Sequence, residues 1–285
     1  LQTLNPNKES ASNAQILFLV LNTSSVTMFP IAVFMYRAQQ GAMNPTDVFI
    51  PILLATFAST TVGLIAVSIK QRINLLQPVI LLYFAAGAAF MLSIVLYFSS
   101  LSADALGQES SLWGNFIILS TLILFVCAAQ RKRVNVYDSF IEGAKEGFET
   151  SIKLIPYLLA MLCAIGMLRA SGALELVVDS IGKLVLLFNG DTRFVDALPT
   201  AILKPLSGSG ARAMMIETMN TYGADSFAGR LSSIMQGSTE TTFYVLAVYF
   251  GAVGIKRTRH AVGCGLIADF AGICAAIAVC YWFFG

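Results

Sequence analysis

Residues 231–284 read LSSIMQGSTETTFYVLAVYFGAVGIKRTRHAVGCGLIADFAGICAAIAVCYWFF, and the order of their apolar and polar segments decides the fold. The apolar stretch Leu231–Phe250 is interrupted by the polar run Gln236–Thr242. A short basic loop follows, and then His260–Phe284, which is long and apolar enough to span a bilayer. Backbone interrupted inside a membrane persists only where it is buried in protein or lines a cavity. The pattern therefore predicts a broken helix beside a full span.

The same order of segments occurs near the start of the chain. Ala14–Tyr36 is an apolar stretch with a polar interruption, and the span Asp47–Ile69 follows it. The interruption consists of Asn22, Thr23, Ser24 and Ser25. Aligning Asn22 with Gln236 gives an offset of 214 residues (236 − 22), which also brings both spans into register. Few residues are identical, so the repeat rests on the pattern.

Loop charges predict that the two copies face opposite ways. Lys and Arg concentrate in loops on the cytoplasmic side, and they gather here at 70–74, 130–135 and 256–259. The segment 99–111 has neither, so we expect it outside. The first span then ends in the cytoplasm and the last begins there. This predicts an all-α, polytopic integral membrane protein built from an inverted-topology repeat with broken helices, an architecture of many secondary transporters.

Composition supports a membrane protein and excludes several other classes. Hydrophobic residues make up 56% of the chain and charged residues 12%, against about 25% charge in soluble domains. A net charge of +2 gives no indication of nucleic-acid binding. The five cysteines have no CxxC spacing, so no metal site is predicted. With one histidine and no nucleophile–base pair, an enzyme is disfavoured.

Further segments complete the predicted architecture. Leu75–Phe98, Leu112–Ala129 and Ile152–Met167 are expected to span the membrane. Residues 136–151 have one apolar face and read as an amphipathic helix on the cytoplasmic interface, or alternatively as a solvated helix start. The stretch 194–220 contains two prolines and predicts a re-entrant hairpin.

Polar residues in these apolar surroundings are the candidate site. A carboxylate at mid-bilayer costs at least about 2.5–3.5 kcal/mol, so Glu240 should bind a cation, a proton or a substrate, unless it lies at the cytoplasmic mouth. Asp269 is a coupling or structural residue that could pair with Arg230 or Arg212, or with backbone groups. The hairpin tip could offer amides to an anion. The candidate substrate- or ion-binding residues are Asn22, Thr23, Ser24, Ser25, Ser207, Gly208, Ser209, Gly210, Gln236, Ser238, Thr239 and Glu240.

Long motifs give the chain a family resemblance. Residues 134–174 and 204–272, which include KPLSGSGARAMMIETMNTYGADSFAGRLSSIMQGSTETTFYV, resemble the bacterial spore maturation protein B family. Residues 5–64 resemble the C-terminal half of spore maturation protein A. The resemblance implies a gate-domain, nucleoside-recognition membrane protein, similar to concentrative nucleoside transporters, in which Gln236, Thr239 and Glu240 look like the substrate-binding hairpin tip. An anionic substrate is also open, since a spore protein of this broad group is associated with dipicolinic acid movement.

The resemblance and the repeat together give the expected organisation. Residues 1–98 form the later half of an A-like repeat with a connecting span, and 99–285 form the B-like repeat. Roughly 80 further residues of the first repeat are expected before Leu1 or in a partner, because position 136 maps to −78 (136 − 214).

Two functions remain open. The first is a secondary transporter of a small polar or anionic metabolite, nucleoside-like or dicarboxylate-like, across the bacterial inner membrane. It needs no cofactor, apart from Na⁺ or H⁺ as a possible coupling ion. The alternative is a non-transporting scaffold or regulatory membrane protein. Expected partners are membrane lipid, a small-molecule substrate, and a second copy of the chain or the missing N-terminal half.

Overall fold

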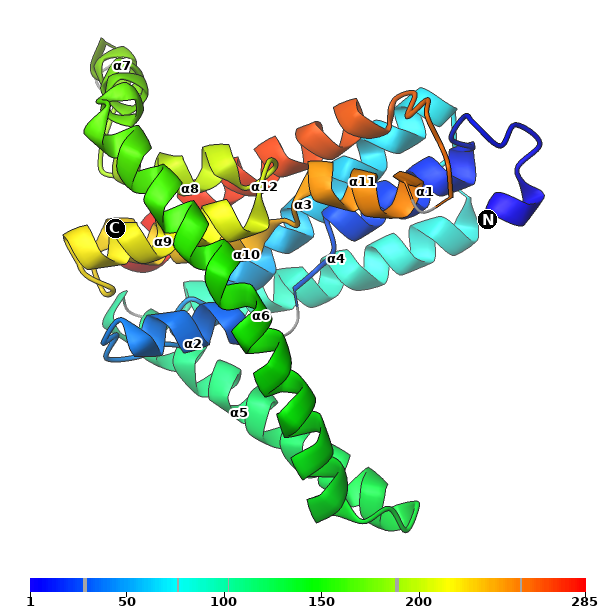
Figure 1. The fold of residues 1–285 in the computed structure, drawn as a ribbon, viewed down its shortest axis with the longest axis horizontal. Helices are drawn as coiled ribbons and strands as arrows, with labels where there is room; N and C mark the ends of the chain where they lie inside the picture. Colours follow the sequence, from blue (N-terminus) through cyan, green and yellow to red (C-terminus); the bar gives the residue numbers. More distant parts are fainter. Residues whose placement is uncertain (28–29, 76, 102, 188–189, 252) are drawn as a thin grey trace.

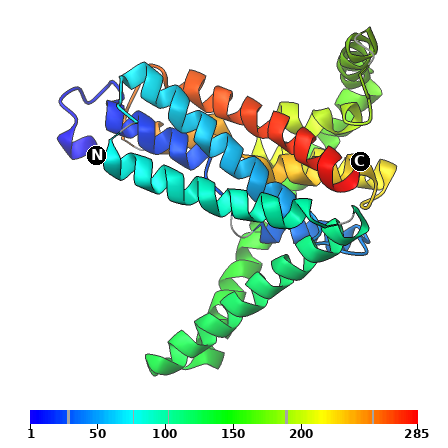
Figure 2. The same ribbon diagram turned by 180° about the vertical axis from the view of Figure 1, so that it is seen from behind.

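The computed structural model is all-α (Figures 1 and 2). It describes the backbone of residues 1–285 except 28–29, 76, 102, 188–189 and 252. The side chains of a further set of helical residues, most of them between 150 and 169, also lie outside the described part. Within what is described, β-type pairing is limited to one isolated bridge between Ser10 and Arg257. The predicted fold class is therefore confirmed.

The helices follow one another with short connections. In chain order they are α1 (Asn13–Thr23), α2 (Ile31–Gln39), α3 (Phe49–Gln71), α4 (Pro78–Ser99), α5 (Ala103–Arg131), α6 (Val136–Ala170), α7 (Ala173–Leu187), α8 (Leu198–Leu203), α9 (Gly208–Tyr222), α10 (Phe227–Ser238), α11 (Thr242–Gly251) and α12 (Ala261–Phe284). Two single 3₁₀ turns, η1 (Gln2–Leu4) and η2 (Val195–Ala197), complete the described elements.

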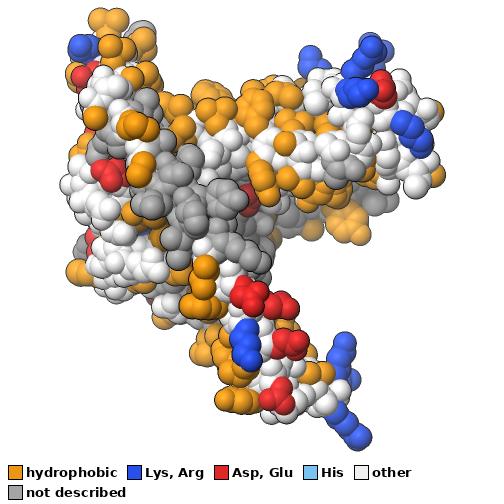
Figure 3. Space-filling view, viewed as in Figure 1, with side chains coloured by type: hydrophobic (Ala, Val, Ile, Leu, Met, Phe, Trp, Pro, Cys, Tyr) orange, Lys and Arg blue, Asp and Glu red, His pale blue; other side chains and the backbone are white. Residues whose placement is uncertain are grey.

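Four helical segments of the described chain are long and apolar enough to cross a membrane. They are Phe49–Gln71, Ile80–Phe98, Gly107–Arg131 and Ala261–Phe284, in α3, α4, α5 and α12. Each coincides with a predicted span. The fifth predicted span, Ile152–Met167, lies in α6, where most side chains are outside the described part. The chain is a polytopic membrane protein, and Figure 3 shows apolar side chains over much of one face of the bundle.

Both copies of the predicted repeat are present. Helices α1, α2 and α3 correspond to α10, α11 and α12, and α1 and α10 begin 214 residues apart, at Asn13 and Phe227 (227 − 13). In each copy a half-helix, a break and a second half-helix precede a full span. In the first copy α1 ends at Thr23 and α2 begins at Ile31, and in the second copy α10 ends at Ser238 and α11 begins at Thr242.

The two equivalent spans lie side by side and antiparallel (Figures 1 and 2). Asp47, just before α3, lines the same cavity as the C-terminal Gly285. Lys70, at the other end of α3, lines a cavity with His260, which precedes α12. The predicted inversion of the repeat is thus seen in the geometry of these two helices.

Small residues allow α3 and α12 to approach closely. An added Cβ at Gly63 would lie 3.0 Å from the Cβ of Ala268, and one at Gly272 would lie 3.1 Å from the Cβ of Ser59. The Ser59 hydroxyl also donates a hydrogen bond to the Ala268 carbonyl at 2.9 Å. Close contact of small residues and interhelical hydrogen bonds hold membrane helices together, because lipid removes the hydrophobic drive between them.

We expect Gly272→Ala to lower the free energy of unfolding by about 1–3 kcal/mol. The new Cβ would lie 2.7 Å from the Cγ2 of Thr239, and Ser59 prevents relief on the other side. Gly263→Ala in the same helix is the matched control. No heavy atom lies within 4 Å of its added Cβ, so helix propensity should raise stability by up to about 1 kcal/mol. Unfolding in a denaturing-detergent series measures both, and equal stability of the variants would contradict the packing at Gly272.

Between the two copies of the repeat, the structure differs from the predicted arrangement of segments in two places. The predicted outer loop 99–111 is short, because α4 ends at Ser99 and α5 begins at Ala103. Residues 136–151 are not a separate helix but the first part of the continuous α6. The sequence FETSIKLI across the expected boundary contains no Gly or Pro to end the helix there. An interfacial position for this part of α6 stays a prediction.

Helices α5 and α6 form a hairpin that projects away from the bundle in both views (Figures 1 and 2). The basic loop Arg131–Arg133 lies between them, at the tip of the hairpin. Charged side chains gather near this tip and around the loop before α12, while the bundle between them is largely uncharged on the face that Figure 3 shows. Loops enriched in Lys and Arg at the ends of apolar helices are typical of membrane proteins.

The stretch predicted as a re-entrant hairpin is a helical hairpin. Helix α8 begins with Pro199 in its first turn and ends at Leu203, and α9 begins at Gly208. Pro205 lies in the turn between them, where its missing N–H costs no helical hydrogen bond. Both helices pack against α10, so the tip of the hairpin is brought to the second helix break.

Candidate functional site at the crossing of the two breaks

The two breaks are joined directly through their backbones. The N–H of Glu240 donates to the carbonyl of Thr23 at 2.8 Å. The hydroxyl of Thr27 donates to the carbonyl of Gly237 at 3.1 Å. The offset of 214 maps Thr23 onto Gly237, so the two accepting carbonyls occupy equivalent positions. Each break thus satisfies a backbone group that the other copy's helix has freed, as irregular backbone inside a membrane requires.

The tip of the α8–α9 hairpin contacts the second break as well. The N–H of Phe243 donates to the carbonyl of Pro205 at 3.0 Å. The side-chain amide of Gln236 reaches the Gly208 carbonyl at 3.5 Å, the limit for a hydrogen bond. Gly208 approaches so closely that an added Cβ would lie 2.7 Å from the Oγ1 of Thr241. Glycine is therefore needed here for the approach of the tip.

Ser207 closes the start of α9. Its hydroxyl accepts a hydrogen bond from the N–H of Gly210 at 3.1 Å and lies 3.3 Å from the Oγ of Ser209. This is the geometry of an N-cap, which satisfies one of the four free amides at a helix start. The remaining first-turn amides and the helix dipole give this end of α9 a partial positive charge. Anion binding by these amides stays a prediction.

Asp269 provides a buried carboxylate beside the second break. It lies in α12 and is 2% exposed. The hydroxyl of Thr242 donates to its Oδ2 at 2.6 Å. Its Oδ1, the Oγ1 of Thr239 and the Oε1 of Gln236 are buried and make no hydrogen bond of normal geometry within the described residues, although the Thr239 hydroxyl lies close enough to the Asp269 carboxylate to stabilise its charge. Buried polar atoms normally have partners, so three such atoms near one break form a polar environment suited to a proton, an ion or a polar group of a ligand.

A buried lysine completes the site. Lys204 follows α8 immediately and is 4% exposed. None of the ion pairs formed within the described part of the chain includes it. The carboxylates whose charges act on its ammonium are those of Glu240 and Asp269. Since burying an unpaired ammonium is costly, an anionic group that reached this position would be stabilised.

The structure separates the predicted residues of the first break. Thr23 and Ser24 are fully buried, and both hydroxyls donate to the carbonyl of Val20, one turn back in α1. The side chain of Asn22 instead donates to the carbonyl of Phe18 at 2.7 Å and points along its own helix. Ser25 is exposed. The first break therefore contributes the carbonyl of Thr23 and the hydroxyl of Thr27 to the crossing.

Glu240 was expected to bind a cation, a proton or a substrate unless it lay at the cytoplasmic mouth, and its role stays a prediction. It lies in the break itself, and its side chain is exposed on the surface of the described structure. Its N–H takes part in the crossing, and the charge of its carboxylate acts on Lys204. Helix α10 continues through Gln236, Gly237 and Ser238, so Glu240 follows the end of the helix.

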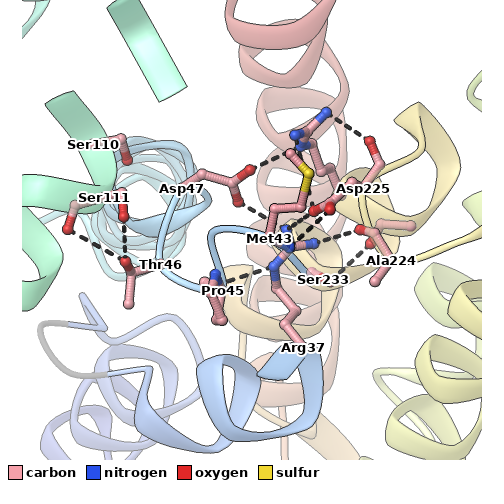
Figure 4. A network of polar contacts seen from close by, with 12 residues as sticks. Arg37, Met43, Pro45, Thr46, Asp47, Ser110, Ser111, Ala224, Asp225 and Ser233 are labelled. Atoms are coloured by element: carbon pink, nitrogen blue, oxygen red, sulfur yellow. Dashed lines mark hydrogen bonds and ion pairs between the residues drawn. The ribbon is translucent and has the colours of Figure 1, made fainter. Parts of the chain in front are cut away.

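A second polar cluster joins the two copies at the other end of α10 (Figure 4). Arg37 of α2 is 0% exposed, and each of its three guanidinium nitrogens has a hydrogen-bond or ion-pair partner. Its Nη2 lies 2.9 Å from Asp47 and 3.2 Å from Asp225. Its Nη1 donates to the Ala224 carbonyl at 2.8 Å, and its Nε donates to the Pro45 carbonyl at 3.1 Å. A fully buried guanidinium is tolerated only with this degree of pairing.

Arg230 completes this cluster from α10. Its Nε donates to the second oxygen of Asp47 at 2.9 Å, and its Nη1 donates to the backbone carbonyl of Asp225 at 2.6 Å. Asp47, 3% exposed in its side chain, is thus held between two guanidinium groups. The cluster fixes the loop before α3 against the loop before α10, and so holds the first copy against the second.

Of the partners considered for Asp269, neither Arg230 nor Arg212 is paired with it in the structure. Arg230 is engaged by Asp47, and the guanidinium of Arg212 lies over the ring of Tyr36, 5.5 Å from its centre. Asp269 is satisfied on one oxygen by Thr242. Arg212 lies in α9 and Arg230 in α10, and sequence spacing alone does not reveal which group each of them meets.

Lys204 and Arg37 were not among the predicted site residues. Lys204 directly precedes Pro205 and the Ser-Gly run, so a rule that treats a single charge flanking a helix break as part of the site would have found it. Arg37 follows the apolar stretch Ala14–Tyr36, in the last turn of α2 and away from the break, where no local pattern marks it.

These features define a gate-type membrane protein: crossed broken helices, a helical hairpin reaching their crossing, and long apolar spans. In agreement, residues 151–256 match the family model described as "Gate: Nucleoside recognition". The chain is 44% identical over 169 residues to spore maturation protein B of Bacillus subtilis (strain 168), an alignment that covers 59% of this chain and 92% of that protein. The chain belongs to the spore maturation protein B family.

A second relative matches over a shorter stretch. Spore maturation protein A of Bacillus subtilis (strain 168) is 39% identical over 59 residues, which cover 21% of this chain and 30% of that protein. The resemblance to both proteins that the sequence motifs indicated is therefore confirmed. No solved structure matches the chain.

Proposed function

We propose that this chain is a secondary transporter component that moves a small polar or anionic metabolite, nucleoside-like or dicarboxylate-like, across the bacterial inner membrane. The observation that carries the proposal is the group of buried, unpartnered oxygens on Asp269, Thr239 and Gln236, which lies where two inverted broken helices cross. Inverted-repeat transporters place substrate and ion sites at such breaks. Ionisable residues inside membranes are expensive, which makes a functional role the default expectation.

Each part of the crossing has a role in this proposal. Lys204 attracts a carboxylate or another anionic group of the solute. Thr239 and Gln236 offer hydrogen bonds to its neutral polar groups. Asp269, with one oxygen held by Thr242 and the other free, takes up the coupling proton or Na⁺. The direct hydrogen bonds between the two breaks represent a closed state, which must open for a solute to enter.

The interlocked breaks also favour a second candidate, a non-transporting scaffold of the spore maturation type. In a scaffold the bond from Glu240 to Thr23 would be permanent, and the polar groups would serve only to fix the two copies. Similarity to both spore maturation proteins supports assembly with a related protein or a second copy under either function. The two candidates differ in whether the crossing ever opens to water.

Uptake by proteoliposomes tests the transporter. We expect the purified full chain, with its related partner if assembly requires one, to accumulate a nucleoside or a dicarboxylate when a Na⁺ or H⁺ gradient is imposed. Asp269→Asn should abolish the dependence on the gradient, because an amide carries neither the proton nor the charge. Thr121→Val, which removes a hydroxyl bonded only within α5, is the control. Absence of gradient-driven uptake for either class of solute would favour the scaffold.

A further inference from the structure

A groove between α3 and α12 lies on the outer side of the bundle, away from the crossing. Its volume is about 640 Å³. The isoleucines Ile65, Ile69 and Ile267 line it and are all exposed. Gly263 forms part of its wall, with no heavy atom within 4 Å of where a Cβ would lie. Because both helices are membrane spans, this apolar wall faces the bilayer rather than water.

One end of the groove is basic. Lys70 closes it from the last turn of α3 and Arg259 from the loop before α12. Neither forms an ion pair within the described residues. Arg259 donates one N–H to the carbonyl of Ala11, which positions the guanidinium and leaves other donors for a ligand. The residues that line the groove include no Asp or Glu.

His260 adds a neutral donor at the same end. Its Nε2 lies 3.2 Å from the amide nitrogen of Gln71, which also donates to the carbonyl of Asn13. The amide nitrogen can only donate, so Nε2 accepts and the ring carries its proton on Nδ1. Burial, together with the charges of Arg259 and Lys70, lowers the pKa of His260 below its usual value and keeps the ring neutral.

The first turn of α12 contributes to the same positive potential. Helix α12 begins at Ala261, directly after His260. Its free amides and the helix dipole favour an anion near the helix start. The groove therefore has a cationic head and a long apolar body, both on one lateral face of the protein.

We propose that this groove binds an anionic diacyl phospholipid, with its phosphate between Lys70 and Arg259 and an acyl chain along Ile65, Ile69 and Ile267. The charge complementarity selects the occupant: a zwitterionic lipid would bring its own cation to a site that already has two. The basic end lies in the loop pair predicted to be cytoplasmic, where anionic lipids and basic residues near the membrane meet. Two spans of opposite copies form the groove, so a bound lipid would bridge the repeat.

Lipid-dependent thermal stability of the purified full chain in a mild detergent tests the site. We expect phosphatidylglycerol to raise the melting temperature in a saturable manner. Phosphatidylcholine and glycerol phosphate should raise it far less, because one lacks net charge and the other lacks the chains. Each basic residue near a membrane surface contributes about 1 kcal/mol to anionic lipid binding. The double variant Lys70→Gln, Arg259→Gln should therefore bind phosphatidylglycerol about thirtyfold more weakly, or about 2 kcal/mol.

Matched variants separate the groove from general charge effects. Lys132→Gln, Arg131→Gln removes the same charge from the exposed tip between α5 and α6 and should respond to phosphatidylglycerol as the unaltered chain does. Gly263→Leu fills the groove without touching the charges and should also lose the response. Gly143→Leu makes the same change at an open position of α6 and should keep it.

Several results would overturn the proposal. They are equal stabilisation by phosphatidylglycerol and phosphatidylcholine, a full response to glycerol phosphate alone, or loss of the response in both double variants alike. Because Gly263→Leu leaves every basic residue in place, a full phosphatidylglycerol response in that variant would also overturn it, even if the charge variants fail to fold.

Discussion

Replacement of Asp47 by alanine should be among the most destabilising single changes in this bundle. Asp47 is bonded on one oxygen to Arg37 and on the other to Arg230. Removal of one partner from a buried ion pair typically costs about 3–5 kcal/mol, because an uncompensated charge remains inside. Arg37, with 0% exposure, cannot reach water without separating α2 from α10. We expect the Asp47→Ala chain to unfold at a markedly lower concentration of denaturing detergent.

Two controls identify the cause of this loss. Asp225→Ala removes a carboxylate that is 31% exposed from the same cluster, so water compensates part of the loss and the effect should be smaller. Asp191→Ala breaks an exposed ion pair with Arg193 and should leave stability unchanged. Replacement of Arg37, Asp47 and Arg230 together by apolar residues should recover part of the stability lost in Asp47→Ala. Equal destabilisation by all three single changes would contradict the assigned role of burial.

The second large effect is expected at Lys204. If its ammonium binds an anionic solute, Lys204→Met removes a charge-assisted hydrogen bond worth about 1.5–3 kcal/mol. Uptake of the anionic substrate should then be about ten- to hundredfold weaker at low concentration. Uptake of a neutral nucleoside-like solute should be changed far less, because Thr239 and Gln236 remain.

The stability of the Lys204→Met chain distinguishes a loss of substrate binding from misfolding. Lys204 is buried and forms no ion pair within the described residues, so replacing it with an apolar residue of similar length should not destabilise the chain. Lys183→Met, at an exposed position of α7, is the matched control and should keep full uptake. Loss of neutral and anionic uptake in equal proportion would show that Lys204 is not an anion partner.

Sequence periodicity predicted the architecture because the bilayer constrains it strongly. The lengths of the apolar stretches located the spans in α3, α4, α5 and α12. The Lys and Arg residues of the loops predicted that the two copies of the repeat face opposite ways. The offset of 214 residues related the two breaks to each other. It succeeded because two copies of one motif must present the same polar interruption at the same distance from their spans, even when few residues are identical.

The sequence could not predict which buried charged residues pair with one another. Arg37 and its partner Asp225 are 188 residues apart, and no local spacing links them. Asp47 was predicted only as the first residue of a span, and Arg230 was assigned to the wrong carboxylate. Such pairs depend on which faces of α2 and α10 meet, which is determined by packing of the whole bundle.

The candidate site was predicted at the level of segments rather than side chains. Thr239 lies in the second break and the Ser207–Gly210 tip reaches it, while Asp269, predicted only as a residue of the last span, lies beside that break. Asn22 instead donates to Phe18 in its own helix, and Ser25 is exposed. Roles for the residues at the crossing remain proposals.

The central claim is that the crossing opens to water on both sides of the membrane during a working cycle. Ser238, buried beside the bond between the two breaks, is the position to probe. In a chain whose five native cysteines are replaced, Ser238→Cys should react with a membrane-impermeant maleimide added from either side. Ser232→Cys, equally buried in α10 but away from the break, should react from neither. A Ser238→Cys chain that is folded and inserted, yet protected from both sides under every ion gradient and solute, would contradict transport and establish the crossing as a fixed structural joint.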